Sequence, residues 1–164
     1  DIVPVDVDGA AGRRFFVRAA DLGTLDAVGD GVAGGGRAAF VAPLDNLTWD
    51  RELLRQVFAF DYCWEVYKPR ETRSFGYYVL PVLYQDRFVA RVEPVFDKKE
   101  KTLGIAGWWW ERGVRPDAAM KEALAQCVAE FGRYLGAAKT ELVGQASTMR
   151  GLRTALGVRA SAAS

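Results

Sequence analysis

The sequence contains no histidine and only two cysteines, Cys63 and Cys127, in 164 residues. The absence of histidine removes the commonest general base and metal ligand, and with it every nucleophilic triad that depends on His. Two distant cysteines without Cys-x-x-Cys spacing do not make an ordinary zinc site and do not require an oxidising compartment. We therefore expect no metal and no cofactor, and we expect both cysteines to be small buried apolar residues.

The chain also lacks a charge imbalance and a long hydrophobic run. Its 22 basic and 21 acidic residues give a formal net charge of +1, so no global field draws it to nucleic acid or to an acidic membrane. No apolar run approaches the ~20 residues that cross a bilayer, and no signal peptide is visible. These features predict a cytoplasmic protein with no membrane partner. Because Asp1 begins what reads as the middle of a structured element, we also expect a fragment of a longer protein.

Apolar and aromatic residues are abundant instead. Half of the sequence is hydrophobic, and it includes five Trp, nine Phe and six Tyr. That composition is typical of a globular domain with a sizeable core, and the length suits one domain. The aromatic residues indicate a sheet-rich interior.

The first 36 residues predict a hairpin, a short helix and a linker. Residues 2–8 alternate apolar and polar side chains, as a half-buried strand does, and residues 14–18 resume the pattern after a glycine turn. Asp21 is placed to cap a helix over residues 22–28. The glycines of residues 29–36 match neither phosphate-binding motif, so they predict a plain linker.

The remainder, residues 37–164, predicts a curled antiparallel sheet or small β-barrel with packed helices, and the fold class is α+β. A strand over residues 37–42 precedes a helix that Thr48 or Asp50 caps. The sheet is a meander that ends in a helix and is followed by a short strand at 141–143 and a short helix near 148–156. Its expected strands and the helix that packs on them cover residues 62–67, 77–84, 87–96, 102–110 and 116–135.

Across most of its length the sequence closely resembles the winged-helix crosslink-repair DNA glycosylase family (YcaQ/AlkZ-like). The resemblance spans roughly residues 1–145. The matching motifs are PLDNLTWDR at 43–51, FDY at 60–62, EVY at 65–67, GYYVLPVL at 76–83 and DRFVARVE at 86–93.

The resemblance implies a C-terminal fragment: the wing hairpin of a winged-helix unit within residues 1–36, followed by a β-barrel-like domain over 37–164. The family's catalytic Gln-x-Gln or Gln-x-Asp motif does not occur, because Gln56, Gln85 and Gln145 are each followed by other residues. We therefore expect a DNA-binding and scaffolding portion, monomeric and not catalytic alone, that contacts double-stranded DNA through the full-length protein. The alternatives are a winged-helix regulatory protein without chemistry and a barrel that binds a small apolar ligand.

Three carboxylates lie near the family motif, at Asp45, Asp50 and Asp61. One of them could face a cleft for N-glycosidic chemistry, but Asp at such positions commonly caps helices and turns, which is the interpretation we favour. Trp49 is interpreted as a core residue that joins domains.

Basic residues on protruding loops are the DNA-binding candidates, because they can neutralise phosphates at little desolvation cost. They fall at the wing, in one loop and at a hairpin tip: Arg13, Arg14, Lys68, Arg70, Arg73, Lys98, Lys99 and Lys101. The run Trp108-Trp109-Trp110 could offer a stacking platform, but neighbouring strand residues point to opposite faces. We favour burial of these tryptophans under the helix over residues 116–135.

Overall fold

Two units, each with its own sheet, make up the part of the chain that the computed structural model describes: residues 1–10, 12–29, 36–144, 149 and 152–153. The first unit combines residues 1–35 with Asp50–Asp61, and the second combines Gly36–Trp49 with residues 62–164. The first sheet has two antiparallel strands and the second has five strands. The molecule is therefore mixed α+β, as the sequence predicts. The predicted domain boundary between residues 36 and 37 stays a prediction.

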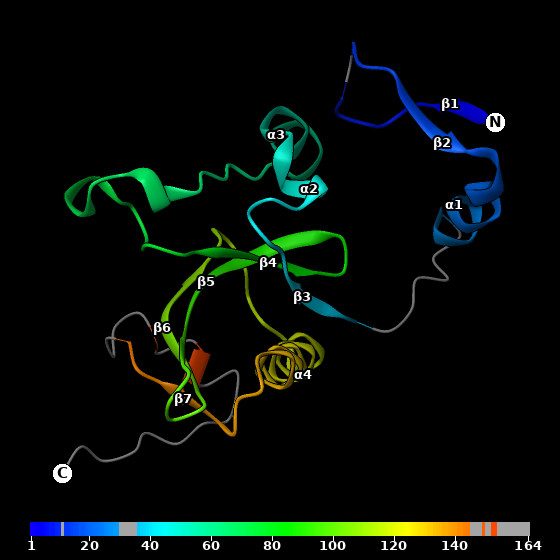
Figure 1. Ribbon diagram of the computed structural model, residues 1–164. Coiled ribbons are helices and arrows are strands. Elements are labelled where there is room, and N and C mark those ends of the chain that lie inside the picture. Colours follow the sequence, from blue (N-terminus) through cyan, green and yellow to red (C-terminus); the bar gives the residue numbers. More distant parts are fainter. Residues whose placement is uncertain (11, 30–35, 145–148, 150–151, 154–164) are drawn as a thin grey trace. The chain divides into compact units, whose positions relative to one another are not determined.

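The first unit is built on a hairpin. Strand β1 (Ile2–Val5) pairs antiparallel with β2 (Phe15–Arg18), and η1 (Ala19–Asp21) leads into helix α1 (Leu22–Gly29) (Figure 1). The predicted hairpin and helix are confirmed, although the strands are shorter than expected. Asp21, predicted to cap α1, lies in η1 and accepts a hydrogen bond from Arg18 Nε at 2.7 Å.

Helix α3 (Arg51–Phe58) also belongs to the first unit, and its first turn decides between the two predicted caps. The Asp50 carboxylate accepts a hydrogen bond from the backbone N–H of Leu53 at 2.9 Å. Thr48 instead lies in α2 (Asn46–Trp49) of the second unit, where its buried hydroxyl donates to the carbonyl of Ala42. Asp50 is therefore the N-cap.

The second unit is a curled five-stranded sheet, a half-barrel, with helix α4 (Ala118–Leu135) packed against it (Figure 1). The strand order is β3-β4-β5-β6-β7; the β6–β7 pair is parallel and the other pairs are antiparallel. The strands are β3 (Ala38–Phe40), β4 (Leu80–Tyr84), β5 (Arg87–Asp97), β6 (Thr102–Trp110) and β7 (Lys139–Leu142).

Two prolines are accommodated inside this sheet. The carbonyl of Pro81 accepts a hydrogen bond from Val41, beyond the end of β3, so the N–H that proline lacks falls where no ladder bond is needed. A register shift follows between Val82 and Leu83. Pro94 lies at a second register shift, directly after Glu93. Both prolines therefore lie at or beside a β-bulge, where a strand tolerates the missing N–H.

Tight turns connect β4 to β5 and β5 to β6. Gln85 and Asp86 form the first, and Gln85 adopts a φ of 54°. In the second, Asp97 Oδ1 accepts hydrogen bonds from the N–H groups of Lys99 and Glu100, at 2.8 and 3.0 Å, and Lys101 adopts a φ of 47°. Both predicted turns are confirmed.

Helix α4 ends where the sequence predicts and begins two residues after the predicted start at Pro116. Asp117 caps it by accepting a hydrogen bond from Met120 N at 2.8 Å, and Gly136, with a φ of 71°, ends it. Leu124 is fully buried and Phe131 is half-buried in the core cluster. The predicted packing of this helix against the sheet is therefore confirmed. Among the described residues, no helix combines the length and the apolar character needed to span a membrane.

The predicted strand over residues 62–67 is wrong. After Tyr62, whose hydroxyl donates to Val79 O at 2.9 Å, the chain forms η2 (Glu65–Tyr67). Strand β4 already has β3 on one side and β5 on the other, so it offers no free edge for another strand. The expected strand near residues 141–143 is β7, and most of the expected helix at 148–156 lies outside the described residues.

Candidate nucleic-acid interface

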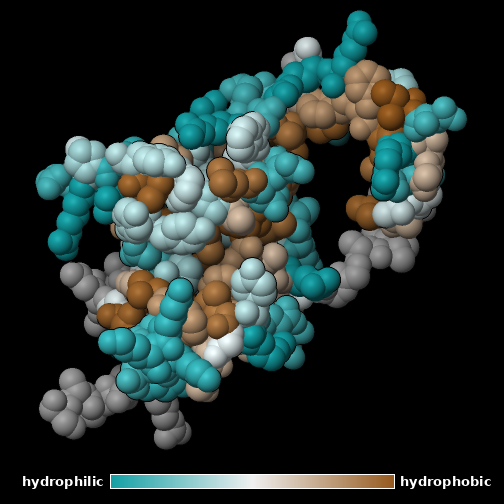
Figure 2. Space-filling view, in the orientation of Figure 1, coloured by the Kyte–Doolittle hydropathy of each residue, from teal (hydrophilic) through white to brown (hydrophobic). Residues whose placement is uncertain are grey.

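Two surface segments of the second unit carry six of the predicted DNA-binding residues. The first is the β5–β6 turn, residues 97–101. The second, here named the Glu65 loop, comprises residues 63–78 and includes η2 and η3 (Arg70–Thr72). Figure 1 shows this loop projecting away from the sheet, and Figure 2 shows that hydrophilic side chains dominate the surface at both segments.

The β5–β6 turn presents three lysines whose side chains form no ion pair within the described part of the chain. Lys98, Lys99 and Lys101 are exposed, and none of them forms an ion pair with a described residue. The Asp97 carboxylate of the same turn accepts hydrogen bonds from two backbone N–H groups and forms no ion pair with these lysines. The lysine ammonium groups are therefore free to meet an external anion.

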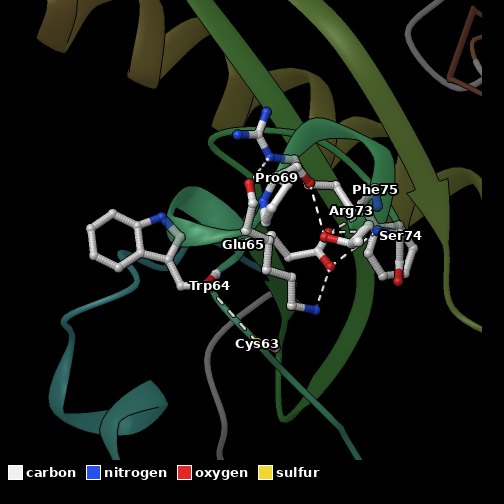
Figure 3. Close-up of polar contacts among 9 residues, drawn as sticks. Cys63, Trp64, Glu65, Pro69, Arg73, Ser74 and Phe75 are labelled. Atoms are coloured by element: carbon white, nitrogen blue, oxygen red, sulfur yellow. Dashed lines mark hydrogen bonds and ion pairs between the residues drawn. The ribbon is translucent and has the colours of Figure 1, made fainter.

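The Glu65 loop is organised around one buried carboxylate (Figure 3). Glu65 exposes only 4% of its surface. Its oxygens accept a hydrogen bond from Lys68 Nζ at 2.8 Å and from the backbone N–H groups of Ser74 and Phe75, each at 3.0 Å. One side chain thus ties η2 to the far end of the loop.

These contacts set the charge state of Glu65. Burial by itself raises the pKa of the carboxyl, but the hydrogen bonds from Lys68, Ser74 and Phe75 favour the ionised form and outweigh it, so the pKa falls to about 2. The bond to Glu65 raises the pKa of Lys68. The pair is therefore ionised at neutral pH.

The other cations of the loop are only partly free. Arg73 Nε donates to the carbonyl of Lys68 at 2.9 Å, and its guanidinium lies 4.9 Å from the centroid of the Tyr77 ring. Arg70, at the start of η3, is exposed and forms no ion pair with a described residue. Of the three predicted cations, Arg70 is the one without an internal contact in the described part of the chain.

Exposed aromatic rings alternate with these cations, and the sequence interpretation missed them. Tyr67 exposes 87% of its surface, and Tyr77, Tyr78 and Phe75 are also exposed. Trp64 contacts the rings of Tyr67 and Tyr78 edge to face, with centroids 5.7 and 6.0 Å apart. The run YKPRETRSFGYY, which mixes aromatic and basic residues, is the signal from which this surface could have been predicted.

The far end of the loop is fixed to the outer face of the sheet. Tyr77 N donates to Glu93 Oε1 at 2.6 Å, and a Cβ on Gly76 would lie 2.5 Å from that carboxylate. Phe75 lies under the Arg91 guanidinium, at 4.5 Å, and meets Trp109 edge to face at 5.5 Å. A side chain at position 76 would therefore push the Glu93 carboxylate away from Tyr77 N.

In the first unit, the two predicted arginines differ. Arg13 Nη2 lies 2.5 Å from Asp50 Oδ2, whereas Arg14 is exposed and forms no ion pair with a described residue. The hydrogen bond from Arg13, joined by that from Leu53 N, lowers the pKa of Asp50 to about 2. Arg13 therefore supports the cap of α3, and Arg14 is the freer cation.

The three carboxylates near the family motif make local contacts. Asp45 accepts a hydrogen bond from Leu47 N at 2.9 Å, and Asp50 caps α3. Asp61 is exposed, with Oδ1 3.5 Å from Arg55 Nε. The favoured interpretation, capping and turn formation, holds for Asp45 and Asp50.

The tryptophans and cysteines correct some expectations. Trp108 is fully buried and contacts Trp110 and Phe40, while Trp109 lies on the opposite face, so the three form no stacking platform. Trp49 exposes 72% of its surface, and its interpretation as core is wrong. Cys127 is buried as predicted, and burial raises the pKa of its thiol to about 12. Cys63 is exposed, contrary to expectation.

An open cleft in the described part of the chain lies against β5, β6 and β7. Its volume is about 220 Å³, and its lining combines valines with charged and polar residues: Val95, Asp97, Glu100, Thr102, Gly104, Lys139, Glu141 and Val143. Within that same part of the chain, no three His, Cys, Asp or Glu side chains are grouped to hold a metal ion.

Comparison with known proteins adds one match. A family model described as DNA glycosylase AlkZ-like matches residues 1–134. No solved structure matches the chain significantly.

Proposed function

Because the chain belongs to the AlkZ-like DNA glycosylase family, we propose that it is the DNA-binding and scaffolding portion of a DNA repair protein and is not catalytic alone. Membership of this family supports a role in DNA repair and DNA as the molecule bound. The non-catalytic role and the individual contacts are the proposal.

One observation carries the DNA-contact proposal: Lys98, Lys99 and Lys101 are exposed on a single short turn and have no ion-pair partner among the described residues. An unpaired ammonium group breaks no internal ion pair when it binds a phosphate. Release of counterions from DNA favours that contact. Lysine is a flexible point charge, so these contacts go to phosphates rather than to base edges.

The remaining predicted residues act with unequal strength in this proposal. Arg14 and Arg70 contact phosphates directly, because each is exposed without an ion pair in the described part of the chain. Arg13, Lys68 and Arg73 already hold internal partners, so they contribute positive field and order the backbone.

The absence of a catalytic motif supports the non-catalytic role. None of the glutamines, Gln56, Gln85, Gln126 and Gln145, begins a Gln-x-Gln or Gln-x-Asp sequence. Asp45 and Asp50 are engaged in a turn and a helix cap. The purified chain should therefore release no modified base from alkylated or crosslinked DNA above a control without enzyme, and measurable release would refute this part of the proposal.

The finer architecture also belongs to the proposal. The β1–β2 hairpin serves as the wing of a winged-helix unit within residues 1–36, and residues 37–164 act as the barrel-like scaffold. The protein works as a monomer on double-stranded DNA in the cytoplasm.

The salt dependence of DNA binding tests the contact surface. In the full-length protein, changing Lys98, Lys99 and Lys101 together to Ala should weaken binding to two duplexes of unrelated sequence equally. The slope of log K against log salt should become shallower by up to about 3, near one unit per lost phosphate contact. Fluorescence anisotropy from about 50 to 200 mM salt measures both quantities.

A matched variant controls for net charge. Arg112 and Arg115 follow the other end of β6, Lys121 lies half-buried in the first turn of α4, and changing the three together to Ala removes the same charge. This control should keep the original slope. An unchanged slope in the Lys98, Lys99 and Lys101 variant would mean that the turn is only a solvated surface.

A further inference from the structure

Resting on the proposed function and deepening it, we infer that the Glu65 loop binds unpaired nucleotides, with the Tyr67 ring stacking on a base and Arg70 contacting a phosphate beside it. The β5–β6 turn would then meet the duplex backbone, and the Glu65 loop would meet bases that are out of the stack.

The first observation in favour of this inference is that Tyr67 is largely exposed and yet contacts a neighbouring aromatic ring. Its ring exposes 87% of its surface, although it belongs to η2, whose first residue, Glu65, is buried. Trp64 holds the ring edge to face at 5.7 Å and also holds Tyr78. An aromatic ring held in place while largely exposed loses little conformational freedom when a base stacks on it.

The second support is the fixed arrangement of charge around the ring. Lys68 follows Tyr67 directly, and the buried Glu65 carboxylate anchors its ammonium group at 2.8 Å while its side chain stays 40% exposed. Arg70 is exposed, and Arg73 lies over the exposed Tyr77 ring. Positive groups that alternate with aromatic rings are what a single strand requires, since its phosphates and base faces alternate in the same way.

The chemistry of the rings selects unpaired nucleotides over an intact duplex. In a duplex, the faces of the bases are covered by their neighbours, so a tyrosine ring has nothing to stack on. In a single strand or an extruded nucleotide the face is free, and stacking tolerates any base because every base has a π-face. Enzymes that act on a base expose it in this way.

The test compares a fluorescein-labelled oligothymidine single strand with a duplex of equal length, using anisotropy and the full-length protein. Tyr67→Ala should weaken single-strand binding about 5- to 150-fold and leave duplex binding within about twofold. Tyr67→Phe keeps the ring and should retain wild-type affinity for the single strand. Tyr134→Ala is the matched control, because Tyr134 is an 83% exposed tyrosine in the last turn of α4 and should change neither affinity.

A second measurement keeps the inference open to refutation if an affinity change reflects damage to the fold. An oligonucleotide containing 2-aminopurine should lose fluorescence when its base stacks on the ring of wild-type protein or of Tyr67→Phe, but not on Tyr67→Ala. Equal single-strand affinity for wild type and Tyr67→Ala, no single-strand binding by the wild type, or equal losses on both DNAs would overturn the inference. Failure of the proposed function would look different, because the β5–β6 turn variant would then leave the duplex salt slope unchanged.

Discussion

The β5–β6 turn and the Glu65 loop each carry three basic residues predicted to contact DNA, but they hold those charges in opposite ways. The lysines of the turn are exposed and have no ion-pair partner in the described part of the chain. In the loop, Lys68 is bonded to a buried carboxylate and Arg73 to a backbone carbonyl and an aromatic ring. Only Arg70 in the loop resembles the turn.

The unpaired lysines of the turn can attract DNA, whereas the paired cations of the loop order its backbone. A free lysine on a turn is mobile and hydrated, so it strengthens binding to any phosphate and is screened by salt. A cation already bound to its own chain adds less to attraction but orders the backbone that carries it. In the Glu65 loop, the ordered backbone presents Tyr67, whose role depends on position rather than on charge.

The largest effect should come from the scaffold that both segments share. Leu124→Ala removes a fully buried side chain of the core and should lower the free energy of unfolding by about 2–5 kcal/mol. Equilibrium urea unfolding measures the change. At temperatures where the variant is folded, single-strand and duplex binding should both stay at wild-type levels. A loss of only one of the two would contradict the assignment of the β5–β6 turn and the Glu65 loop to a shared scaffold.

A smaller effect should distinguish the loop by its pH dependence. The pKa of Glu65 is lowered from 4.5 to about 2 in the folded chain, so folding favours the ionised form. Its stabilisation is complete above about pH 4.5 and is lost as the pH falls toward 2. Urea unfolding of wild type and Glu65→Gln between pH 6 and 2.5 should show two stability curves that converge in acid. Parallel curves would contradict this prediction.

At neutral pH, Glu65→Gln should itself cost about 1–3 kcal/mol, because Lys68 loses its charged partner while the amide oxygen can still accept from Ser74 and Phe75.

The smallest effect should be on stability at the turn. Changing Lys98, Lys99 and Lys101 to Ala should alter the free energy of unfolding by no more than about 0.5 kcal/mol, because exposed side chains without partners contribute little. Thermal unfolding followed by circular dichroism provides the measurement. A loss above 1 kcal/mol would mean that the lysines stabilise the fold, and their effect on DNA could then no longer be assigned to phosphate contacts.

The features predicted correctly from the sequence are those that neighbouring residues determine. Helix α4 has its cap at Asp117, its apolar stripe and its terminating Gly136 within one continuous segment. The turn between β4 and β5 follows from two residues between apolar runs. The β5–β6 turn was found in the same way, and with it the exposed lysines.

The features missed depend on contacts between distant residues. The run over residues 62–67 alternates as a strand does, but Glu65 turns inward because backbone N–H groups at Ser74 and Phe75 meet its carboxylate. No local sequence pattern predicts the hydrogen bonds from Ser74 and Phe75 to Glu65. Trp49 was expected in the core because tryptophan usually is, yet its neighbour Thr48 is buried and Trp49 itself is exposed. The exposed tyrosines of the loop were missed because aromatic residues are usually expected in the core.

The parallel pairing of β7 with β6 bears on the order in which the half-barrel assembles. Strands β4, β5 and β6 are joined by short turns, so their ladders close small loops, whereas β7 reaches β6 only after α4 has crossed between them. Closing the longer connection costs more chain entropy before any contact rewards it. The β7 ladder should therefore form after the β4–β5 and β5–β6 ladders in refolding and open before them under native conditions. In hydrogen exchange, amides of residues 139–142 that bond to β6 would lose protection while those of the β5–β6 ladder still report global unfolding.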